Sequence, residues 1–222
     1  MAQTISADEW AVRRRHMVEG QLRACDVTDL AVLAAFGRIP REAFVAPAFA
    51  SLAYADRQIP ALGAHGRALL APMVLARLVQ AAGVRAGDRA LDVAGGSGYG
   101  AMILAALGAE VVALESDADA AAQAKALTAG AAGVASVVGD FATPAPGGPF
   151  DLILVNGAFG RSPDELLDQL AAGGRLVGVD SSLGAPKAVL IERVGGVASR
   201  RVLFDAAAPN LEAFSPHPSF AF

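Results

Sequence analysis

Two acids that bracket a glycine-rich turn are the residues of this chain best suited to chemistry. Asp92 ends a short apolar segment, and Glu115 ends the next one, about 20 residues after Gly95, Gly96 and Gly98. Glycine lets a backbone approach a ligand closely, and a helix N-terminus offers free N–H groups. An acid placed like Glu115 can accept hydrogen bonds from ribose hydroxyls. The pattern predicts a nucleoside-binding β-α-β unit.

Asp92 indicates which nucleoside is bound. The segment Gly96-Ser-Gly-Tyr-Gly-Ala101 also satisfies the G-x-G-x-x-G/A pattern of nicotinamide dinucleotide sites. An acid just before it would face a pyrophosphate badly, but suits the amino group or sulfonium charge of S-adenosylmethionine (AdoMet). AdoMet methyltransferases carry E/D-x-G-x-G-x-G, and here Ala94 replaces the first glycine. We therefore expect AdoMet. The alternatives are a nicotinamide dinucleotide and a tight turn that binds no ligand.

The elements that must position these residues alternate along the chain. Strands are expected at 89–93, 110–115, 135–139, 150–155 and 175–180, and helices at 99–107, 118–128 and 163–171. Segments 188–194 and 199–204 flank Gly195-Gly196 and predict an antiparallel hairpin. Alternating β and α segments indicate an α/β fold with a doubly wound, mostly parallel, seven-stranded sheet of Rossmann-like type.

The N-terminal region predicts helices rather than strands. Ser6-Ala-Asp-Glu9 is a capping box that opens a helix to about Arg23, and Thr28 is expected to cap a second helix over 29–36. A helix over 72–82 begins at Pro72 and is closed by Gly83. We expect one domain over 1–222, in which 1–70 is a helical lid over the carboxyl ends of the strands and 71–222 is the AdoMet-binding core.

Composition excludes several classes of function. The chain has 222 residues and a net charge of −4, so nucleic-acid binding is not expected. No leader or membrane-spanning segment is apparent. The single Cys25 is expected to be a buried structural thiol. One cysteine cannot form an internal disulfide, which fits a reducing compartment, so a cytoplasmic protein is expected. His16 and His217 have no metal-binding companions, and no metal site is predicted.

Motifs along nearly the whole chain resemble one family. They are Ile39-Pro-Arg-Glu-Ala-Phe-Val45, Tyr54-Ala-Asp56, Asp88-Arg-Ala-Leu-Asp-Val93, Gly96-Ser-Gly-Tyr99, Val138-Gly-Asp140, Phe150-Asp-Leu-Ile-Leu-Val155 and Gly173-Gly-Arg-Leu-Val177. In these the chain is similar to the protein-L-isoaspartate O-methyltransferases. The resemblance implies methyl transfer from AdoMet to the side-branch carboxylate of isoaspartyl residues in damaged proteins. The ester then forms a succinimide, which can reopen to normal aspartate.

The resemblance and the residue types together predict the cofactor contacts. Asp92 would hold the methionine part of AdoMet, Glu115 the ribose and Asp140 the adenine amine, with Phe141 packed on the ring. Asp140 could instead cap a turn, and Phe141, which replaces a family glycine, could belong to the core. The expected cofactor-binding residues are Asp92, Ala94, Gly95, Gly96, Ser97, Gly98, Tyr99, Glu115, Ser116, Asp140, Phe141 and Asn156.

The segment expected to meet the methyl acceptor departs from the family. Where the family reads Gly-x-Thr-Ile-Ser-x-Pro, this chain reads Gly66-Arg-Ala-Leu-Leu-Ala-Pro72, so both hydroxyls are lost at Ala68 and Leu70. We expect His65, Arg67 and Leu70 to contact the substrate, with Arg67 or His65 as replacement donors. No catalytic residue is assigned, because an ionised carboxylate needs no general base and the reaction depends on positioning.

Two other functions remain open at this point. One is a methyltransferase of the same fold with another acceptor, and the other is an AdoMet-binding protein that has lost catalysis. Isoaspartyl proteins or peptides are the expected partners, without nucleic acid or membrane, and the sequence does not indicate an oligomeric state.

Overall fold

The computed structural model describes residues 5–182 and 184–216. Its main sheet has seven strands in the order β5-β4-β3-β6-β7-β8-β9. Neighbours from β5 to β7 pair in parallel, whereas β8 and β9 are antiparallel additions at one edge. The strands are β3 (Arg89–Val93), β4 (Glu110–Glu115), β5 (Val134–Val138), β6 (Phe150–Phe159), β7 (Leu170–Asp180), β8 (Lys187–Val194) and β9 (Val197–Asp205). The expected α/β, mostly parallel, seven-stranded fold is confirmed.

The two faces of the sheet are covered differently. Along β6, Leu152 and Leu154 belong to the core beneath the helices, whereas Ile153 and Val155 belong to the core of the other face. The first face is packed against α3 (Pro72–Ala82), α4 (Tyr99–Ala106) and α5 (Ala118–Thr128). The second is covered by the one-turn helix α6 (Asp164–Leu167) and by a C-terminal segment that contributes Phe214.

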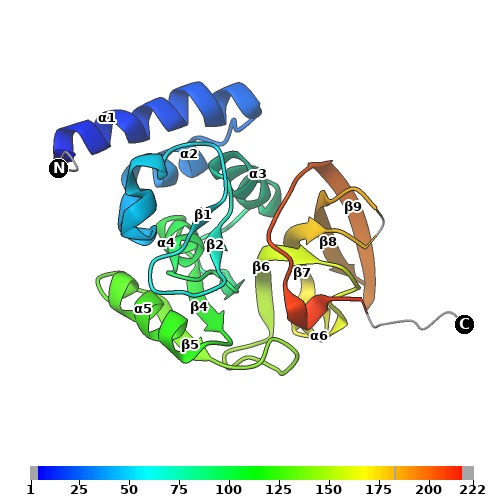
Figure 1. The fold of residues 1–222 in the computed structure, drawn as a ribbon. Coiled ribbons are helices and arrows are strands. Elements are labelled where there is room, and N and C mark those ends of the chain that lie inside the picture. The colour runs from blue at the N-terminus through cyan, green and yellow to red at the C-terminus, as the bar shows by residue number, and fades with distance from the viewer. Residues whose placement is uncertain (1–4, 183, 217–222) are drawn as a thin grey trace, which may run out of the picture.

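The N-terminal helices form an outer layer at one end of the molecule, away from the β8–β9 hairpin (Figure 1). Helix α1 (Ala7–Met17) begins at Ser6, whose hydroxyl accepts from the Glu9 N–H as predicted, and continues as a π turn over Val18–Leu22 and a 3-10 turn over Arg23–Cys25. Helix α2 (Leu30–Arg38) packs on α3 and α4. Two further 3-10 turns cover Arg41–Phe44 and Pro47–Leu52.

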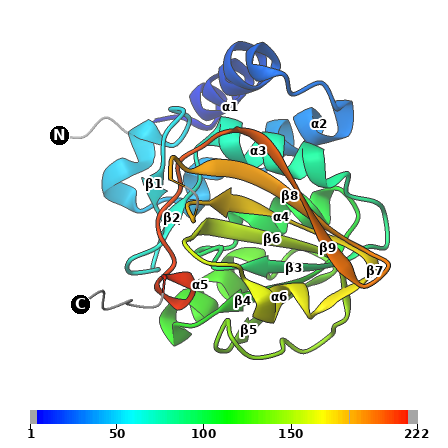
Figure 2. The same cartoon turned by 90° about the vertical axis from the view of Figure 1, so that its right-hand side faces the viewer.

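A small two-stranded ribbon follows this layer. Strand β1 (Ile59–Pro60) pairs antiparallel with β2 (Ala68–Leu69), and the intervening residues 61–67 form a loop. In Figure 2 the ribbon lies beside the arrowheads of the parallel strands. Carboxyl ends of parallel strands are where ligands of doubly wound sheets bind. The loop therefore lies at the end of the sheet where a ligand is expected to bind. We call residues 61–67 the cover loop.

Several local expectations are wrong. A helix over 163–171 was expected, but α6 stops at Leu167 because the carbonyl of Gln169 already accepts from Phe150 N–H, which draws the chain into the sheet. Asp29, not Thr28, caps α2, since its side chain accepts from two N–H groups of the first turn. Cys25 is only half-buried. His217 lies outside the described residues.

Two arginines join distant parts of the fold. Arg41 is fully buried and donates to the carbonyls of Ala53 and Leu70, both at 2.8 Å, which fixes the entry into α3. Arg175 of β7 donates to the carboxylate of Asp88 at 2.6 Å and to the carbonyl of Gly83 at 2.8 Å, at the other end of the sheet. Among the described residues no helix is long and apolar enough to cross a membrane.

Candidate cofactor-binding site

The predicted cofactor residues gather at the carboxyl ends of three neighbouring strands. Asp92 and the glycine turn lie at the end of β3, Glu115 ends β4, and Asn156 lies in β6. Strand β3 pairs with both β4 and β6, so residues far apart in sequence meet at one edge. This is the position expected for a ligand site in a doubly wound sheet.

Asp92 is fully buried beneath the glycine turn. Its Oδ1 accepts from Nδ2 of Asn156 at 2.7 Å, and its Oδ2 is buried without a hydrogen-bond partner. A methyl group at Gly95 would lie 2.3 Å from Oδ2, and one at Gly100 would lie 2.7 Å from Oδ1. Both positions must therefore be glycine for this carboxylate to fit.

Burial also changes the ionisation of Asp92. It raises the pKa of the carboxyl from 3.8 to about 7, and the nearby negative charge of Glu115 adds to the rise, although the hydrogen bond from Asn156 opposes it. A cationic group placed next to Oδ2 would favour the charged form again. The unpaired Oδ2 is thus able to accept from a cationic donor.

Glu115 is likewise almost fully buried, with 2% of its surface exposed. Its Oε1 accepts from the backbone N–H of Gly96 at 2.6 Å, which fixes the carboxylate against the glycine turn. Its Oε2 accepts from Nε of Arg67 at 3.1 Å. The acid expected to bind ribose hydroxyls therefore points into the site, but it already has a cationic partner.

The glycine turn contains one strained residue. Ala94 has a φ of 58°, in the left-handed region that favours glycine. It stands where the family pattern has its first glycine, so the conformation is retained without the residue that adopts it most easily. The cost of the left-handed conformation is about 1–2 kcal/mol for a residue with a Cβ.

The side chains of Ser97 and Tyr99 are directed away from the cofactor position. The Ser97 hydroxyl donates to the carbonyl of Phe44 at 2.6 Å, and the Tyr99 ring packs against Phe36 and Phe44. Burial raises the pKa of Tyr99 to about 12. Cofactor contacts from these two residues therefore stay a prediction for their backbone groups. Their side chains dock the N-terminal segment, and only their backbone faces the turn.

Asp140 and Phe141, both expected near adenine, make the contacts of a turn-capping residue and of a core residue, respectively. Asp140 is exposed and its Oδ1 accepts from Ala142 N–H at 2.9 Å, as a turn-capping residue does. Phe141 is buried and stacks on Phe214, with ring centroids 6.4 Å apart. Ser116 is exposed and accepts from Nη2 of Arg67 at 2.9 Å.

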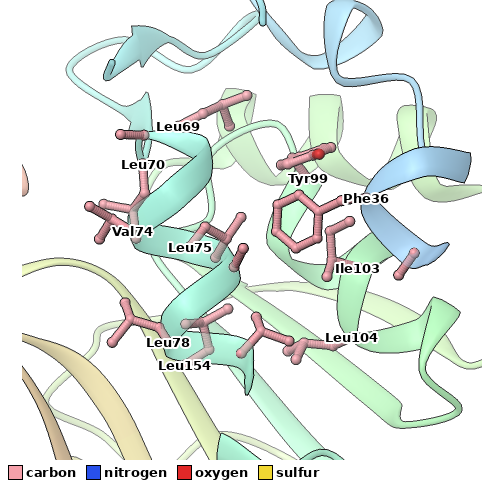
Figure 3. Close-up of a cluster of buried hydrophobic side chains, with 14 of the residues drawn as sticks. Phe36, Leu69, Leu70, Val74, Leu75, Leu78, Tyr99, Ile103, Leu104 and Leu154 are labelled. Carbon is pink, nitrogen blue, oxygen red and sulfur yellow. The ribbon is translucent and has the colours of Figure 1, made fainter. Parts of the chain in front are cut away.

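The three residues expected at the acceptor are not brought together. His65 is exposed in the cover loop. Leu70 is 1% exposed and packs among the core side chains labelled in Figure 3, so its expected contact with substrate is wrong in this conformation. An apolar side chain next to Val74 and Leu75 is held by the core. Arg67 lies on the cofactor side, where it pairs with Glu115.

Sequence reasoning missed two features of this region. It gave Arg41 no role, and it did not pair Arg67 with Glu115. Nothing in the local sequence connects residues 48 positions apart. The local sequence gives no signal that Arg41 is buried, because the charged Glu42 follows it directly.

Comparison with known proteins identifies the family. The family model for protein-L-isoaspartate(D-aspartate) O-methyltransferase (PCMT) matches residues 12–191. A protein-L-isoaspartate O-methyltransferase from Methylorubrum populi is 44% identical over 166 residues, which are 74% of this chain and 77% of that relative. One from Methanoculleus marisnigri is 40% identical over 176 residues, 78% of this chain and 79% of that relative.

This chain belongs to the protein-L-isoaspartate O-methyltransferase family. Solved structures agree with this at the level of the fold. One protein-L-isoaspartate O-methyltransferase has a TM-score of 0.78 at 23% identity, over 91% of this chain and 67% of that one. A Plasmodium falciparum beta-aspartate methyltransferase, solved with S-adenosyl-L-homocysteine, has a TM-score of 0.77 at 20% identity, over 90% and 98%.

The site has the features that an AdoMet-type cofactor needs in a protein-L-isoaspartate O-methyltransferase. A buried carboxylate oxygen without a partner lies below the turn, and the glycines leave no side chains above it. A second buried carboxylate, Glu115, lies at the end of the next strand. The residues present therefore fit the cofactor, provided that the partner of Glu115 can leave.

Proposed function

We propose that this chain transfers the methyl group of AdoMet to the side-branch carboxylate of isoaspartyl residues in proteins or peptides. The observation that carries the proposal is the buried, unpartnered Oδ2 of Asp92 beneath the glycine turn, in a chain of this family. An unsatisfied buried carboxylate oxygen costs free energy unless a ligand satisfies it. An ammonium group on a ligand supplies both a hydrogen-bond donor and a positive charge to this oxygen.

At the cofactor end, each residue has a distinct part. Asp92 would accept from the amino group of the methionine moiety, and Asn156 holds the Asp92 carboxylate in place. Glu115 would accept from the ribose hydroxyls, and Phe141 would border the adenine. When bound, AdoMet supplies an electrophilic methyl group on a sulfonium. The rest of catalysis is orientation and exclusion of water.

At the acceptor end, the chain has to hold a carboxylate in line with that methyl group. The carboxylate is ionised at neutral pH and needs no general base, so donors that fix its orientation are the requirement. Ala68 supplies none, and Leu70 is in the core. His65 and Arg67 remain our candidates for these donors. We also propose that 1–70 acts as a lid on the core formed by 71–222.

A second candidate function follows from the lost hydroxyls. A protein of this fold with Ala68 and Leu70 could accept another carboxylate or a small molecule, or could bind AdoMet without turnover. A methyl-transfer assay separates these functions. We expect labelled methyl incorporation from AdoMet into an isoaspartyl peptide and not into its aspartyl twin. Equal labelling of both, or of neither, would defeat the isoaspartyl proposal.

We further propose a cytoplasmic protein that acts without nucleic acid. A single half-buried cysteine is suited to a reducing compartment. The net charge of −4 disfavours general attraction to a polyanion. Fractionation of the native protein, and its elution from an immobilised nucleic acid, test the two statements.

A further inference from the structure

The guanidinium of Arg67 lies among the residues proposed for the nucleoside. Its Nε donates to Oε2 of Glu115 at 3.1 Å, and its Nη2 donates to the hydroxyl of Ser116 at 2.9 Å. Its Cζ is 5.4 Å from the centre of the Phe141 ring, at cation–π distance. Glu115 is the proposed ribose ligand and Phe141 the proposed border of adenine. Arg67 thus lies where the ribose and the base would have to lie.

The cover loop packs against the glycine turn next to this site. A methyl group at Gly96 would lie 2.9 Å from Cβ of Ala61 and 3.2 Å from Cβ of Arg67. The space next to this glycine is therefore already filled by the loop. At the other side of the loop, a methyl group at Gly63 would lie 2.8 Å from the side chain of Gln123 in α5. In this arrangement the loop therefore contacts the turn directly at Gly96.

The ion pair between Arg67 and Glu115 stabilises the closed arrangement. A carboxylate as buried as Glu115 is costly unless it is paired, and Arg67 supplies a charge-assisted hydrogen bond. Ribose hydroxyls can also donate to this carboxylate, so they can replace the hydrogen bond of Arg67 although not its charge. The two occupants need the same space between Glu115 and Phe141.

The cover loop is packed at one of its glycines and open at the other. Gly63 and Gly66 have φ angles of 64° and 73°, conformations that glycine adopts without strain. A methyl group at Gly66 would meet no atom within 4 Å, so the backbone just before Arg67 is not packed in. The loop backbone itself is held by Ala61 N–H, which donates to the carbonyl of Arg67 at 3.0 Å, and by Leu62 N–H, which donates to the carbonyl of Phe44 at 2.9 Å. Release of Glu115 therefore requires the side chain of Arg67 to move.

We propose that Arg67 is a latch on the nucleoside end of the site, which must leave Glu115 before the cofactor can bind. The inference rests on the proposed AdoMet site. A latch of this kind makes the protein compete with its own cofactor, because only the unlatched fraction is competent to bind. The latch also makes the guanidinium of Arg67 available next to Ala68 only when the cofactor is bound.

Calorimetry with S-adenosylhomocysteine (AdoHcy) tests the latch without turnover. If about nine-tenths of the wild-type protein is latched, Arg67→Gln should bind AdoHcy about tenfold more tightly. Arg67→Met keeps the apolar bulk of the side chain and should show the same gain in affinity. It shows whether the gain comes from loss of the charge or from altered packing. Arg15→Gln, on the exposed face of α1, is the matched control for charge and should not change the affinity. Unchanged or weaker binding by both Arg67 variants would overturn the latch.

A double-mutant comparison shows whether Glu115 is the partner that matters. In a Glu115→Gln background the latch is already released, so adding Arg67→Gln should change AdoHcy affinity less than twofold. A further tenfold gain there would contradict the proposal, since it would place the effect of Arg67 elsewhere.

Nitrogen-15 NMR of arginine Nε–H groups observes the latch directly. The signal that is lost in Arg67→Gln should be protected from exchange in the free protein and should lose that protection when AdoHcy is added. A signal that AdoHcy binding leaves unchanged would overturn the proposal. A protein that binds AdoHcy and releases Arg67, yet methylates no isoaspartyl peptide, would instead defeat the proposed acceptor alone.

Discussion

The Nδ2 of Asn156 donates to Oδ1 of Asp92 at 2.7 Å and to the carbonyl of Val93 at 3.1 Å. One amide thereby ties β6 to the end of β3 and decides which carboxylate oxygen is left free. Because Oδ1 is engaged, the unpaired Oδ2 faces the glycine turn. The geometry of the site depends on this contact as much as on the acid itself.

The raised pKa of Asp92 makes the stability of the ligand-free protein depend on pH. The carboxyl titrates near 3.8 when unfolded and at about 7 when folded, so the folded state binds more protons between these values. Stability should therefore fall as pH rises from about 4 to about 7, and level off above. Urea unfolding across this range should show the fall in wild type and a smaller one in Asp92→Asn.

The same variant should lose cofactor binding, because an amide cannot replace the charge facing an ammonium group. We expect Asp92→Asn to weaken AdoHcy binding by roughly 10- to 100-fold, as for a hydrogen bond to a charged group. Asp168→Asn, on an exposed carboxylate with no part in the proposed site, is the control and should leave both the affinity and the pH dependence intact. An identical pH dependence of stability in wild type and Asp92→Asn would contradict the reasoning.

Ala94→Gly should stabilise the protein or leave its stability unchanged. Glycine removes the left-handed strain of about 1–2 kcal/mol and returns about 0.5–1 kcal/mol of chain entropy to the unfolded state. Ala122→Gly, at an exposed position inside α5, is the matched control and should cost about 1 kcal/mol. Thermal melting compares the two. A loss for Ala94→Gly as large as for Ala122→Gly would mean that the turn carries no strain.

Arg175→Met should destabilise the protein strongly. The guanidinium satisfies the buried carboxylate of Asp88 and the carbonyls of Ala82, Gly83 and Asp151, so its removal leaves an uncompensated charge and costs roughly 3–5 kcal/mol. Arg89→Met removes a half-exposed pair with Asp151 at 3.9 Å and should cost less than about 1 kcal/mol. Urea midpoints measure both, and equal losses would show that burial is not the cause.

Restoring the two family hydroxyls should have opposite effects at the two positions. Ala68 is half-buried beside Arg67, so Ala68→Thr should be tolerated and should raise isoaspartyl methylation, by about 10-fold if one donor is regained. Leu70→Ser places a hydroxyl in the core and should cost roughly 3 kcal/mol or more. Turnover assays and melting curves report the two effects. A Leu70→Ser protein as stable as wild type would show that this segment can turn outward.

The parts of the fold that follow from local patterns were predictable. Helix α5 over Ala118–Thr128 and strand β4 over Glu110–Glu115 have the expected bounds, since apolar period and caps determine both. Helix 163–171 was not predictable, because pairing of Leu170 with Phe150 overrides the helical tendency of that segment.

For the site, the sequence predicted which residues gather but not all of their contacts. Asp92, Glu115 and Asn156 meet at one edge because the alternation of elements predicts parallel strands, whose carboxyl ends share that edge. The directions of Ser97 and Tyr99 could not be read, since a partner 53 residues away, the carbonyl of Phe44, decides the first of them. The engagement of Arg67 depends likewise on how a loop folds over the sheet.

The hydrogen bond from Ser97 to Phe44 has a consequence for how the molecule opens. The first residue of α4, Tyr99, packs on Phe36 and Phe44, so the outer helical layer is fastened to the glycine turn itself. We expect amide protons of α1 and α2 to exchange with solvent as one cooperative unit below the global unfolding free energy. Any ligand that stiffens the turn should then slow exchange in helices that it never touches.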